Sequence, residues 1–326
     1  MKNKIALILG ANGQDASYLA ELLIEKGYVV HGTIRRNSVP ESQTTRIQPL
    51  RDSNQITLHY MDLTDPISVE SIINELKPDE IYHLAAQSHV QISFELPKYT
   101  LDVNSGGTLA VLEAVRKFSP NSKVYHAATS EMFGNQSDQD YFQRETTKMI
   151  PVSPYGCSKL YAHSLCHNYR NSYNIFISSG ILFNHESPRR GINFVTNKVV
   201  LEAVKIKLGL SNELVLGNLD AMRDWGHAKD YVEGMWLMLQ QEKPDDYVLA
   251  TGMSNKVKDL VDYVFNKLEL DSEKYVKSDK KFERAEELHY LRGDATKAKT
   301  KLGWQPKYTF ESMLDEMIEY WLNKLS

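Results

Sequence analysis

The amino-acid sequence predicts an α/β protein with a doubly wound parallel sheet and a smaller α/β lobe. Short β-rich runs alternate with helical patterns through the first 185 residues. A glycine-rich turn, "GANG", separates the first of these runs from the first helical pattern. After residue 185 the alternation fades into polar, arginine-bearing segments. Regular alternation implies parallel strands whose connecting helices cover both faces of the sheet, and its loss implies a second, smaller lobe.

The predicted strands are short runs rich in β-branched and aromatic residues. They span residues 5–10, 29–34, 56–63, 80–86, 123–128 and 176–183. After the first strand, apolar residues recur at helical spacing as far as Gly27, which is expected to end that helix. A helix over 66–76 is expected to have Asp65 as its N-cap and Pro66 at its first position.

The strand and helix patterns divide the chain into two parts. A helix over 228–241 and a strand over 247–252 are expected to return to the sheet. The larger domain is therefore expected to comprise residues 1–185 and about 218–252, and the smaller lobe about 186–217 and 253–326.

The composition is typical of a soluble globular protein, with 42% apolar and 25% charged residues among 326. Neither a transmembrane run nor a signal peptide is recognisable. A net charge of −4 argues against non-specific nucleic-acid binding. Cys157 and Cys166 suit neither a disulfide framework nor a zinc site, and are expected to be buried free thiols. The sequence thus predicts a cytoplasmic protein with no metal, membrane or nucleic-acid partner.

The turn "GANGQDA" is a candidate phosphate-binding loop. It lies between a predicted strand and a predicted helix, where helix N–H groups point at a bound anion. Gly10 and Gly13 would let the backbone approach a pyrophosphate, with Asn12, Gln14 and Asp15 around it. The spacing is G-x-x-G-x-x-A, and the alternative is a purely structural turn. In this position it favours a Rossmann-type dinucleotide-binding domain.

The end of the second predicted strand indicates which dinucleotide is bound. NAD enzymes usually place an acidic residue there, whereas a 2′-phosphate is held by arginine. Here Arg35 and Arg36 are followed by Asn37 and Ser38, with no acid among them. Arginine forms charge-assisted, often bidentate hydrogen bonds with phosphate. The alternative is a solvated basic pair, but the sequence favours NADP.

The segment "SPYGCSKLYAH" places Tyr155 and Lys159 four residues apart, on one face of a predicted helix. A tyrosine that acts as a base at neutral pH needs its pKa lowered by about three units, or roughly 4 kcal/mol. One cation about 4 Å away supplies ~4 kcal/mol at an effective dielectric constant of ~20. Such a pair also occurs by chance on many helices. Upstream, Thr129 and Glu131 in "TSEMFG" follow a predicted strand, where a lone glutamate is most often solvent-facing.

Together these motifs resemble the extended short-chain dehydrogenase/reductase family, and within it the GDP-mannose 4,6-dehydratase group. The similar segments include "GANGQDASYLAELLIEKGY", "HGTIRRNS", "LAAQSHVQISFELPKYT", "TSEMFG", "SPYGCSKLYAH", "GILFNHESPRRG", "RDWGHAKDY" and "GDATKAKTKLGWQP". They extend from the first strand almost to the C-terminus. The resemblance implies an NADP-dependent 4,6-dehydratase of a GDP-linked hexose, and a homodimer or homotetramer whose 35–52 loop reaches a neighbouring subunit's cofactor.

The resemblance also implies roles for individual residues. Tyr155 would take the proton of the C4 hydroxyl, Lys159 would lower its pKa, and Thr129 would bind O4. Glu131 would be the acid and base at C5 and C6 during loss of water. Cofactor contacts are implied for Gly10, Asn12, Gly13, Gln14, Asp15, Arg35, Arg36, Asn37, Ser38, Asp62, Leu63, Leu84, Ala85, Ala86, Ser88, Tyr99, Tyr155, Lys159, His185 and Arg190. Substrate contacts are implied for Ser88, Asn184, Lys198, Arg223, Arg284 and Glu287.

Three departures from the family pattern bear on the substrate. Ala16 replaces the usual third glycine, "FERAEELHY" lacks the proline often found after Arg284, and the loop over 135–154 is unlike the commoner sequences. GDP-mannose is the default substrate, GDP-N-acetylglucosamine a close rival and GDP-heptose a lesser one. Two other functions stay open: an NADP-dependent nucleotide-sugar epimerase or reductase, which needs no Glu131, and a non-catalytic NADP-binding regulator.

Overall fold

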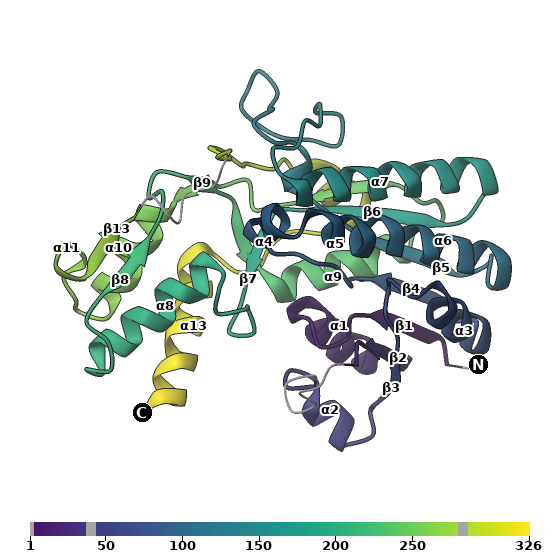
Figure 1. The fold of residues 1–326 in the computed structure, drawn as a ribbon, viewed down its shortest axis with the longest axis horizontal. Helices are drawn as coiled ribbons and strands as arrows, with labels where there is room; N and C mark the ends of the chain where they lie inside the picture. Colours follow the sequence, from purple (N-terminus) through teal and green to yellow (C-terminus); the bar gives the residue numbers. More distant parts are fainter. Residues whose placement is uncertain (1–2, 37–43, 280–285) are drawn as a thin grey trace.

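The computed structural model describes residues 3–36, 44–279 and 286–326 (Figure 1). The predicted roles of Asn37, Ser38 and Arg284 therefore fall outside the described residues. Seven parallel strands form the main sheet in the order β11-β6-β5-β4-β1-β2-β3. They are β1 (Ile5–Leu9), β2 (Val29–Ile34), β3 (Ile56–Tyr60), β4 (Glu80–His83), β5 (Lys123–Thr129), β6 (Ile177–Leu182) and β11 (Asp246–Leu249). The predicted doubly wound parallel sheet is confirmed.

Several strands end earlier than predicted. The strand expected over 56–63 ends at Tyr60, and the one expected over 80–86 ends at His83. The apolar residues that follow, such as Leu63 and Ala85, leave the sheet as loops and pack beneath helices or against the glycine turn. Apolar character alone could not separate a strand from the buried loop that continues it.

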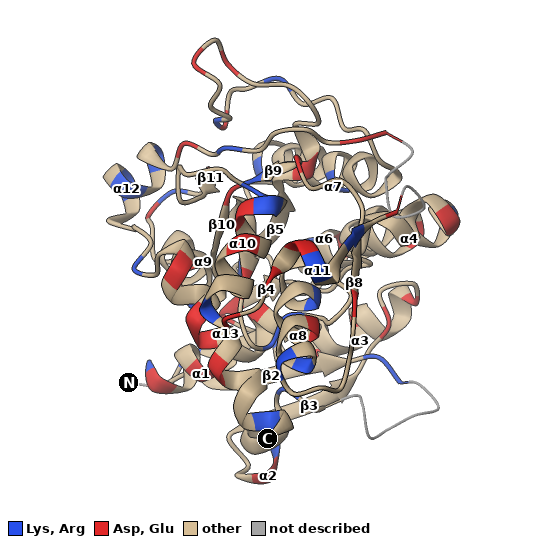
Figure 2. Ribbon diagram, turned by 90° about the vertical axis from the view of Figure 1, so that its left-hand side faces the viewer, with Lys and Arg blue, Asp and Glu red and all other residues tan. Residues whose placement is uncertain are grey.

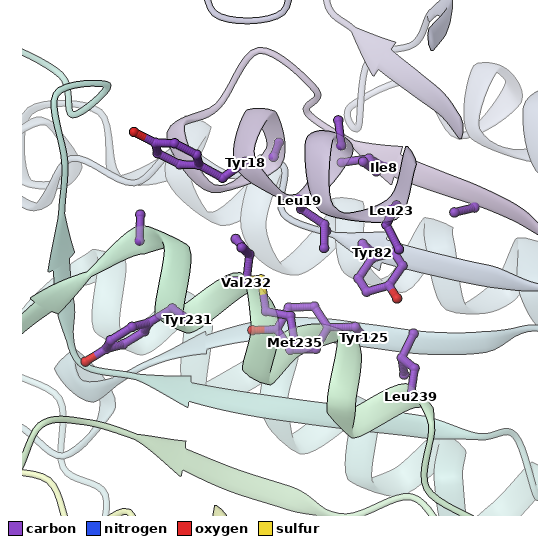
Figure 3. Packing of buried hydrophobic residues seen from close by; sticks show 14 of the residues in the cluster. Ile8, Tyr18, Leu19, Leu23, Tyr82, Tyr125, Tyr231, Val232, Met235 and Leu239 are labelled. Carbon is purple, nitrogen blue, oxygen red and sulfur yellow. The ribbon is translucent and has the colours of Figure 1, made fainter. Parts of the chain in front are cut away.

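Helices cover both faces of the sheet. Alternate residues of β1 point in opposite directions, so Ala6 and Ile8 join one apolar core while Leu7 and Leu9 join another. On the first face α1 (Gln14–Glu25) packs against α9 (Ala228–Leu239), over Tyr82 and Tyr125 of the sheet (Figure 3). On the second face lie α3 (Pro66–Leu76), α6 (Gly107–Phe118) and α7 (Pro154–Tyr173).

The helix ends follow the local signals in the sequence. Asp65 caps α3 by accepting a hydrogen bond from Ile67 N, and Pro66 is its first residue, as predicted. Gly27 follows α1 with φ of +81°, a left-handed conformation that suits glycine. Ser153 caps α7 by accepting from Gly156 N at 3.0 Å. The start of α7 is therefore determined two residues before Tyr155.

A second apolar core lies beside the sheet, at the left of Figure 1. It is built from α8, α10 and α13, with the short strands β8 and β13 paired in parallel. The elements beyond the main sheet are α2 (Gln48–Asp52), α4 (Val90–Glu95), α5 (Pro97–Leu101), a π-helix (Asp102–Gly106), α8 (Val195–Lys207), α10 (Val257–Lys267), α11 (Ser272–Tyr275), α12 (Thr296–Leu302), α13 (Phe310–Leu325), β7 (Asn184–Glu186), β8 (Leu214–Leu216), β9 (Met222–Arg223), β10 (Trp225–His227), β12 (Asn255–Lys256) and β13 (Val276–Ser278).

One segment expected in the smaller lobe packs on the larger body instead. Leu288 and Leu291 join a cluster with Phe133 and Phe183 at the end of the sheet. Further on, α12 packs against β11 and α9, and Trp304 donates a hydrogen bond to Asp230 O at 2.7 Å. We propose that the two-part division holds with about 286–308 added to the larger part. The predicted return of residues 228–241 and 247–252 to the sheet corresponds to α9 and β11.

The cysteine prediction needs one correction. Both cysteines belong to α7. Cys166 faces the core and is buried, but Cys157 is exposed, because it lies on the opposite side of that helix. On the face drawn in Figure 2, basic and acidic residues are interspersed along α8, α11 and α13. Among the described residues, no helix combines the length and the apolar character that a membrane crossing requires.

Replacing Gly134 with alanine is expected to destabilise the protein by about 3 kcal/mol or more, because two penalties combine. Its φ is +58°, and an added Cβ would lie 1.9 Å from the carbonyl oxygen of Ile150. Gly209 has φ of +73° with open space around it, so Gly209→Ala should cost only about 1 kcal/mol. Denaturant titration of the two variants checks this, and equal losses would contradict it.

Candidate active site

The candidate site lies where the order of strands reverses. Strand β1 lies between β2 and β4, so the connections after β1 and β4 diverge to opposite faces of the sheet. Ligands of doubly wound proteins bind in the crevice at such a point, beyond the carboxyl ends of the strands. The predicted glycine turn follows β1, residues 84–88 follow β4, and Thr129 ends β5. The fold therefore brings most of the predicted residues together beyond the carboxyl ends of the strands.

The glycine turn has the geometry of a phosphate cradle. Gly10 has φ of +85°, and a Cβ there would lie 2.9 Å from the Cα of Ala85. Gly13 is the N-cap of α1, so it adds no side chain over the first amides of the helix. The amide of Ala11 donates to Thr33 O at 2.8 Å, which fixes the turn against β2. A pyrophosphate fits this cradle because backbone N–H groups and a helix N-terminus face it without steric obstruction.

Arg46 holds the glycine turn, a role that no motif in the sequence predicts. Its amide donates to Asn12 Oδ1 at 2.9 Å and its guanidinium to Asn12 O at 3.1 Å. Its Nε also donates to Arg189 O at 2.7 Å. The turn is thereby tied to the segment that carries His185 and Arg190. Only the folded chain brings these three segments together.

A pocket of about 250 Å³ lies at the end of β2 and β3. It is lined by Arg35, Arg36, Tyr60, Met61, Asp62, Asp65 and Ser68. Arg36 donates to the Tyr60 hydroxyl at 3.3 Å, and Arg35 donates to the Tyr99 hydroxyl. Leu63 packs under Gly107, where a Cβ would lie 2.7 Å from it. Of the predicted adenosine-side residues in the described ranges, Arg35, Arg36 and Asp62 line this pocket, together with a second carboxylate, Asp65.

Asp15 and His185 form an ion pair beneath the glycine turn. Their Oδ2 and Nε2 atoms are 2.8 Å apart, and His185 Nδ1 donates to Phe183 O at 2.7 Å. Burial opposes the charge on both groups. The charge and hydrogen bond of the partner outweigh it, so the pKa of His185 is raised and that of Asp15 is lowered. Gln14 completes the contact by donating to Asp15 Oδ1 at 3.0 Å.

This pair makes a testable contribution to stability. The His185 part is complete below its unfolded pKa of about 6.5 and is lost as pH rises through the higher folded value. The Asp15 part is complete above about pH 3.9 and is lost at lower pH. Asp15→Asn should therefore destabilise the protein more at about pH 5.5 than at about pH 8.5. Unfolding titrations at both pH values measure the difference, and a pH-independent loss would contradict it.

Thr129, Glu131 and Tyr155 come together at the end of β5. Thr129 ends the strand, the turn Ser130–Met132 follows it, and α7 packs directly on this turn. The Tyr155 hydroxyl is hydrogen-bonded to the Thr129 side chain and lies within the field of the Glu131 carboxylate. All three are less than 9% exposed. The glutamate is thus buried beside the tyrosine, and the solvent-facing interpretation of Glu131 is wrong.

The protein groups alone do not make Tyr155 a strong base. Burial raises the pKa of Tyr155 to about 12, with the Thr129 hydrogen bond opposing and the Glu131 charge adding to the shift. The Lys159 ammonium donates to Ala127 O at 2.8 Å, and burial lowers the pKa of Lys159 to about 8. The predicted lowering of the Tyr155 pKa is therefore not produced within the chain, because burial of the phenol outweighs it.

Two supports of the catalytic helix escaped the sequence interpretation. A Cβ at Gly156 would lie 2.9 Å from Glu131 O, so only glycine lets α7 approach the glutamate this closely. Asn104, in the π-helix, donates to Ser158 Oγ at 3.0 Å and to Gln87 O at 3.0 Å. It therefore ties the turn after β4 to the helix that carries Tyr155. The irregular π-turn at residues 102–106 is a signal that only the coordinates reveal.

Of the predicted substrate contacts, two form a pair. Arg223 Nη2 lies 3.5 Å from Glu287 Oε1, and Nη1 donates to Leu288 O at 2.7 Å. Lys198 donates to Val215 O at 2.7 Å, on the second core. Asn135 joins them by donating to Glu287 O at 3.0 Å. These residues link the loop after Glu131 to the smaller lobe.

Arg190 contacts Glu186 and Phe194, and its charge acts on Tyr155. Its Nε is 3.1 Å from Glu186 Oε2, and its guanidinium stacks 3.7 Å from the centre of the Phe194 ring. The ring of Phe194 in turn contacts His89, which follows Ser88 after β4. The charge of Arg190 acts on Tyr155, lowering the pKa of the phenol against the larger effect of burial. The segment 184–190 thus brings a positive charge into the surroundings of Tyr155.

Within the described residues, no group of three or more His, Cys, Asp or Glu side chains is arranged to hold a metal ion.

Comparisons with known proteins identify similar sequences and similar folds. A family profile for GDP-mannose 4,6 dehydratase matches residues 7–317. GDP-mannose 4,6 dehydratase 1 of Arabidopsis thaliana is 50% identical over 97% of the chain and 89% of its own length. The human GDP-mannose 4,6 dehydratase is 49% identical over 96% and 90%. Among solved structures, a UDP-glucose 4-epimerase of Thermotoga maritima superposes with a TM-score of 0.86 at 24% identity, covering 99% and 100% of the two chains. A dTDP-glucose 4,6-dehydratase of Bacillus anthracis superposes at 0.84 with 21% identity, covering 99% and 97%.

Proposed function

Because this chain belongs to the GDP-mannose 4,6-dehydratase family, we propose that it converts a GDP-hexose, GDP-mannose by default, into the GDP-4-keto-6-deoxy sugar. It is a nucleotide-sugar 4,6-dehydratase, a hydro-lyase. The observation that carries the proposal is the burial of Thr129, Glu131 and Tyr155 around one point. An oxidation at C4 uses the first and last of these. Only an elimination gives the glutamate a task.

The first step is oxidation at C4. A nicotinamide cofactor held at the glycine turn would supply the hydride acceptor for C4. Tyr155 takes the proton of the C4 hydroxyl, and Thr129 donates a hydrogen bond to O4 as its charge changes. Since burial holds the pKa of Tyr155 at about 12, the base needs added positive charge nearby. We propose that Lys159, one helical turn along the same face, adds its charge to that of Arg190, which already lowers the pKa of Tyr155.

The second step is loss of water across C5 and C6. A ketone at C4 makes the C5 proton acidic, and the C6 hydroxyl must be protonated to leave. Glu131 would serve both tasks, first as the base at C5 and then as the acid at C6, after which C6 would regain the hydride taken from C4 and C5 would regain a proton. Its neighbour Ser130 cannot transfer protons as a second carboxylate would, so one carboxylate serves both steps.

For the cofactor we propose NADP. Support comes from the pocket lined by Arg35 and Arg36, whose guanidinium groups suit a 2′-phosphate. Solved neighbours of the same fold were crystallised with NAD or NADPH, so the fold alone leaves the choice open. Arg36→Asp should weaken NADP binding about tenfold or more, since a charge-assisted hydrogen bond is worth roughly 1.5–3 kcal/mol. NAD binding, measured in the same titration, should change little, and equal losses would argue for NAD.

The substrate is tested by incubating the enzyme and cofactor with GDP-mannose or GDP-N-acetylglucosamine and weighing the products. A product lighter by one water supports the dehydratase, and the preferred substrate identifies the hexose. C4 epimers or reduced sugars without loss of water would support an epimerase or reductase instead. An enzyme that binds NADP without converting any sugar would support a regulator.

We also propose a cytoplasmic homodimer or homotetramer, with the loop 35–52 reaching a neighbour's cofactor. Helices α5, α6 and α7 expose large apolar side chains that a second copy would cover. These are Leu101, Leu109, Tyr161 and Tyr173, each between 37% and 51% exposed. Light scattering coupled to size-exclusion chromatography measures the mass, and a monomer would overturn the proposal.

A further inference from the structure

A row of polar side chains crosses the face of the sheet that α7 covers. His83 of β4 is in register with His126 of β5, His126 with Ser179 of β6, and Ser179 with Asp246 of β11. Register partners on parallel strands point to the same face, so the four side chains form one line with steps of about 4.8 Å. Val124, two residues before His126, belongs to the apolar core on this face. The line is therefore a polar strip within an otherwise apolar layer.

Most of this strip is buried without hydrogen-bond partners. His83, His126 and Ser179 are 4%, 1% and 0% exposed. Among the described residues, the buried polar atoms at this strip that lack a hydrogen-bond partner are His83 Nδ1, both ring nitrogens of His126, Ser179 Oγ and, on the covering helix α7, His163 Nδ1. Buried polar atoms in native proteins are almost always paired. Five unpaired atoms in one strip therefore indicate positions for ordered water, which pairs with such groups.

The strip joins the active site at one end and the sheet edge at the other. The Lys159 ammonium donates to Ala127 O, the residue beside His126. At the far end, Asp246 on the edge strand β11 is 16% exposed in its side chain and pairs with Arg170. His163, one turn along α7 from Lys159, lies 3.8 Å from Asp246. The strip thus runs from Asp246, whose side chain is partly exposed, to His126 and His83, on which the charge of Lys159 acts.

The imidazole rings along the strip are uncharged, so each can accept a proton at one nitrogen and release one from the other. Thr108 donates its hydroxyl hydrogen to Asn104 O, so its oxygen accepts from His83 Nε2 and leaves His83 Nδ1 with a lone pair. Burial and then the charge of Lys159 lower the pKa of His83 to about 3 and that of His126 well below its usual value. From α7, Cys166 also lies near Lys159, but burial raises the pKa of its thiol. It stays protonated and does not compete for the proton.

We propose that this strip, completed by ordered water, is a proton path that connects Lys159 with solvent behind the sheet. The inference rests on the proposed dehydratase function, in which Tyr155 receives the C4 hydroxyl proton. The Lys159 ammonium breaks one N–H bond and releases a proton, which forms one O–H or N–H bond in the strip, and the lysine nitrogen then forms a new N–H bond with the proton that leaves the Tyr155 phenol. A proton leaves to solvent at Asp246, and no electrons are exchanged. The reverse movement reloads Lys159 while the substrate covers the front of the site.

Blocking the strip tests the path. His126→Leu removes both nitrogens at its centre and should lower kcat about tenfold, a part of the 10²–10⁴-fold that proton transfer contributes. KM should stay within about twofold, and the solvent deuterium isotope effect on kcat should rise above that of the unaltered enzyme. Ser179→Ala, which removes only a hydroxyl, should shift both quantities in the same direction by less. The matched control is His167→Gln, one turn beyond His163 on the exposed side of α7.

Two outcomes would overturn the path. One is an unchanged isotope effect and pH profile in both Ser179→Ala and folded His126→Leu. The other is a high-resolution crystal structure that shows the strip dry between Ser179 and His126, a readout independent of activity. Failure of the unaltered enzyme to dehydrate any GDP-hexose would overturn the proposed function instead, and it is seen before any variant is made.

Discussion

Replacing Tyr155 with phenylalanine is expected to lower kcat by about 10²–10⁴-fold, because the general base at the C4 hydroxyl is lost. The ring fills the same space, so the packing of α7 should survive. The hydroxyl is buried, and Thr129 beside it keeps the hydrogen bond that its side chain accepts from Glu131 N at 3.3 Å. NADP binding should change by less than about tenfold, since the glycine turn and Arg36 remain. Steady-state kinetics with GDP-mannose and a cofactor titration measure the two effects.

The control for this variant is Tyr161→Phe on the same helix. Tyr161 is 51% exposed, so its hydroxyl is free of the active site. Its kcat should match that of the unaltered enzyme. If Tyr155→Phe kept a comparable rate, the phenol would not be the base, and the assignment of the whole site would fail.

Replacing Glu131 with glutamine is expected to abolish loss of water while sparing part of the first oxidation. Glutamine has nearly the same shape but cannot accept the C5 proton or protonate the C6 hydroxyl. The rate of dehydration should fall by about 10²–10⁴-fold. Reduced cofactor should build up, because C4 can still be oxidised while the hydride has no C6 acceptor to return to. Absorbance of the reduced nicotinamide and mass spectrometry of the sugar follow the two events separately.

Glu145→Gln is the matched control for the glutamate variant. Glu145 is also partly buried, but its carboxylate accepts a hydrogen bond from Val248 N at 2.8 Å, at the edge of the sheet. Glutamine can still accept this bond, so activity should be retained. Unimpaired dehydration by Glu131→Gln would favour an epimerase or reductase chemistry, which needs the tyrosine but not this carboxylate.

Features that depend on neighbouring residues could be predicted from the sequence. The alternation of strands and helices, the Asp65 cap and the glycine turn all depend on local conformational preferences, and the structure has them where they were expected. The i, i+4 spacing also placed Tyr155 and Lys159 on the buried side of one helix. The ends of the strands could not be predicted from the sequence, because the apolar pattern continues into buried loops such as the one at Leu63.

The sequence by itself determined the doubly wound sheet, the glycine turn and the identity of the candidate catalytic residues, because each is written in a short stretch of chain. Only the tertiary structure decided that Asp15 pairs with His185, 170 residues away, that Gly156 admits the backbone of Glu131, and that Trp304 donates a hydrogen bond to Asp230 O. It also decided that four polar residues on four strands share one register. The physical reason is that register and helix packing are set by the burial of whole faces at once, which no local pattern specifies.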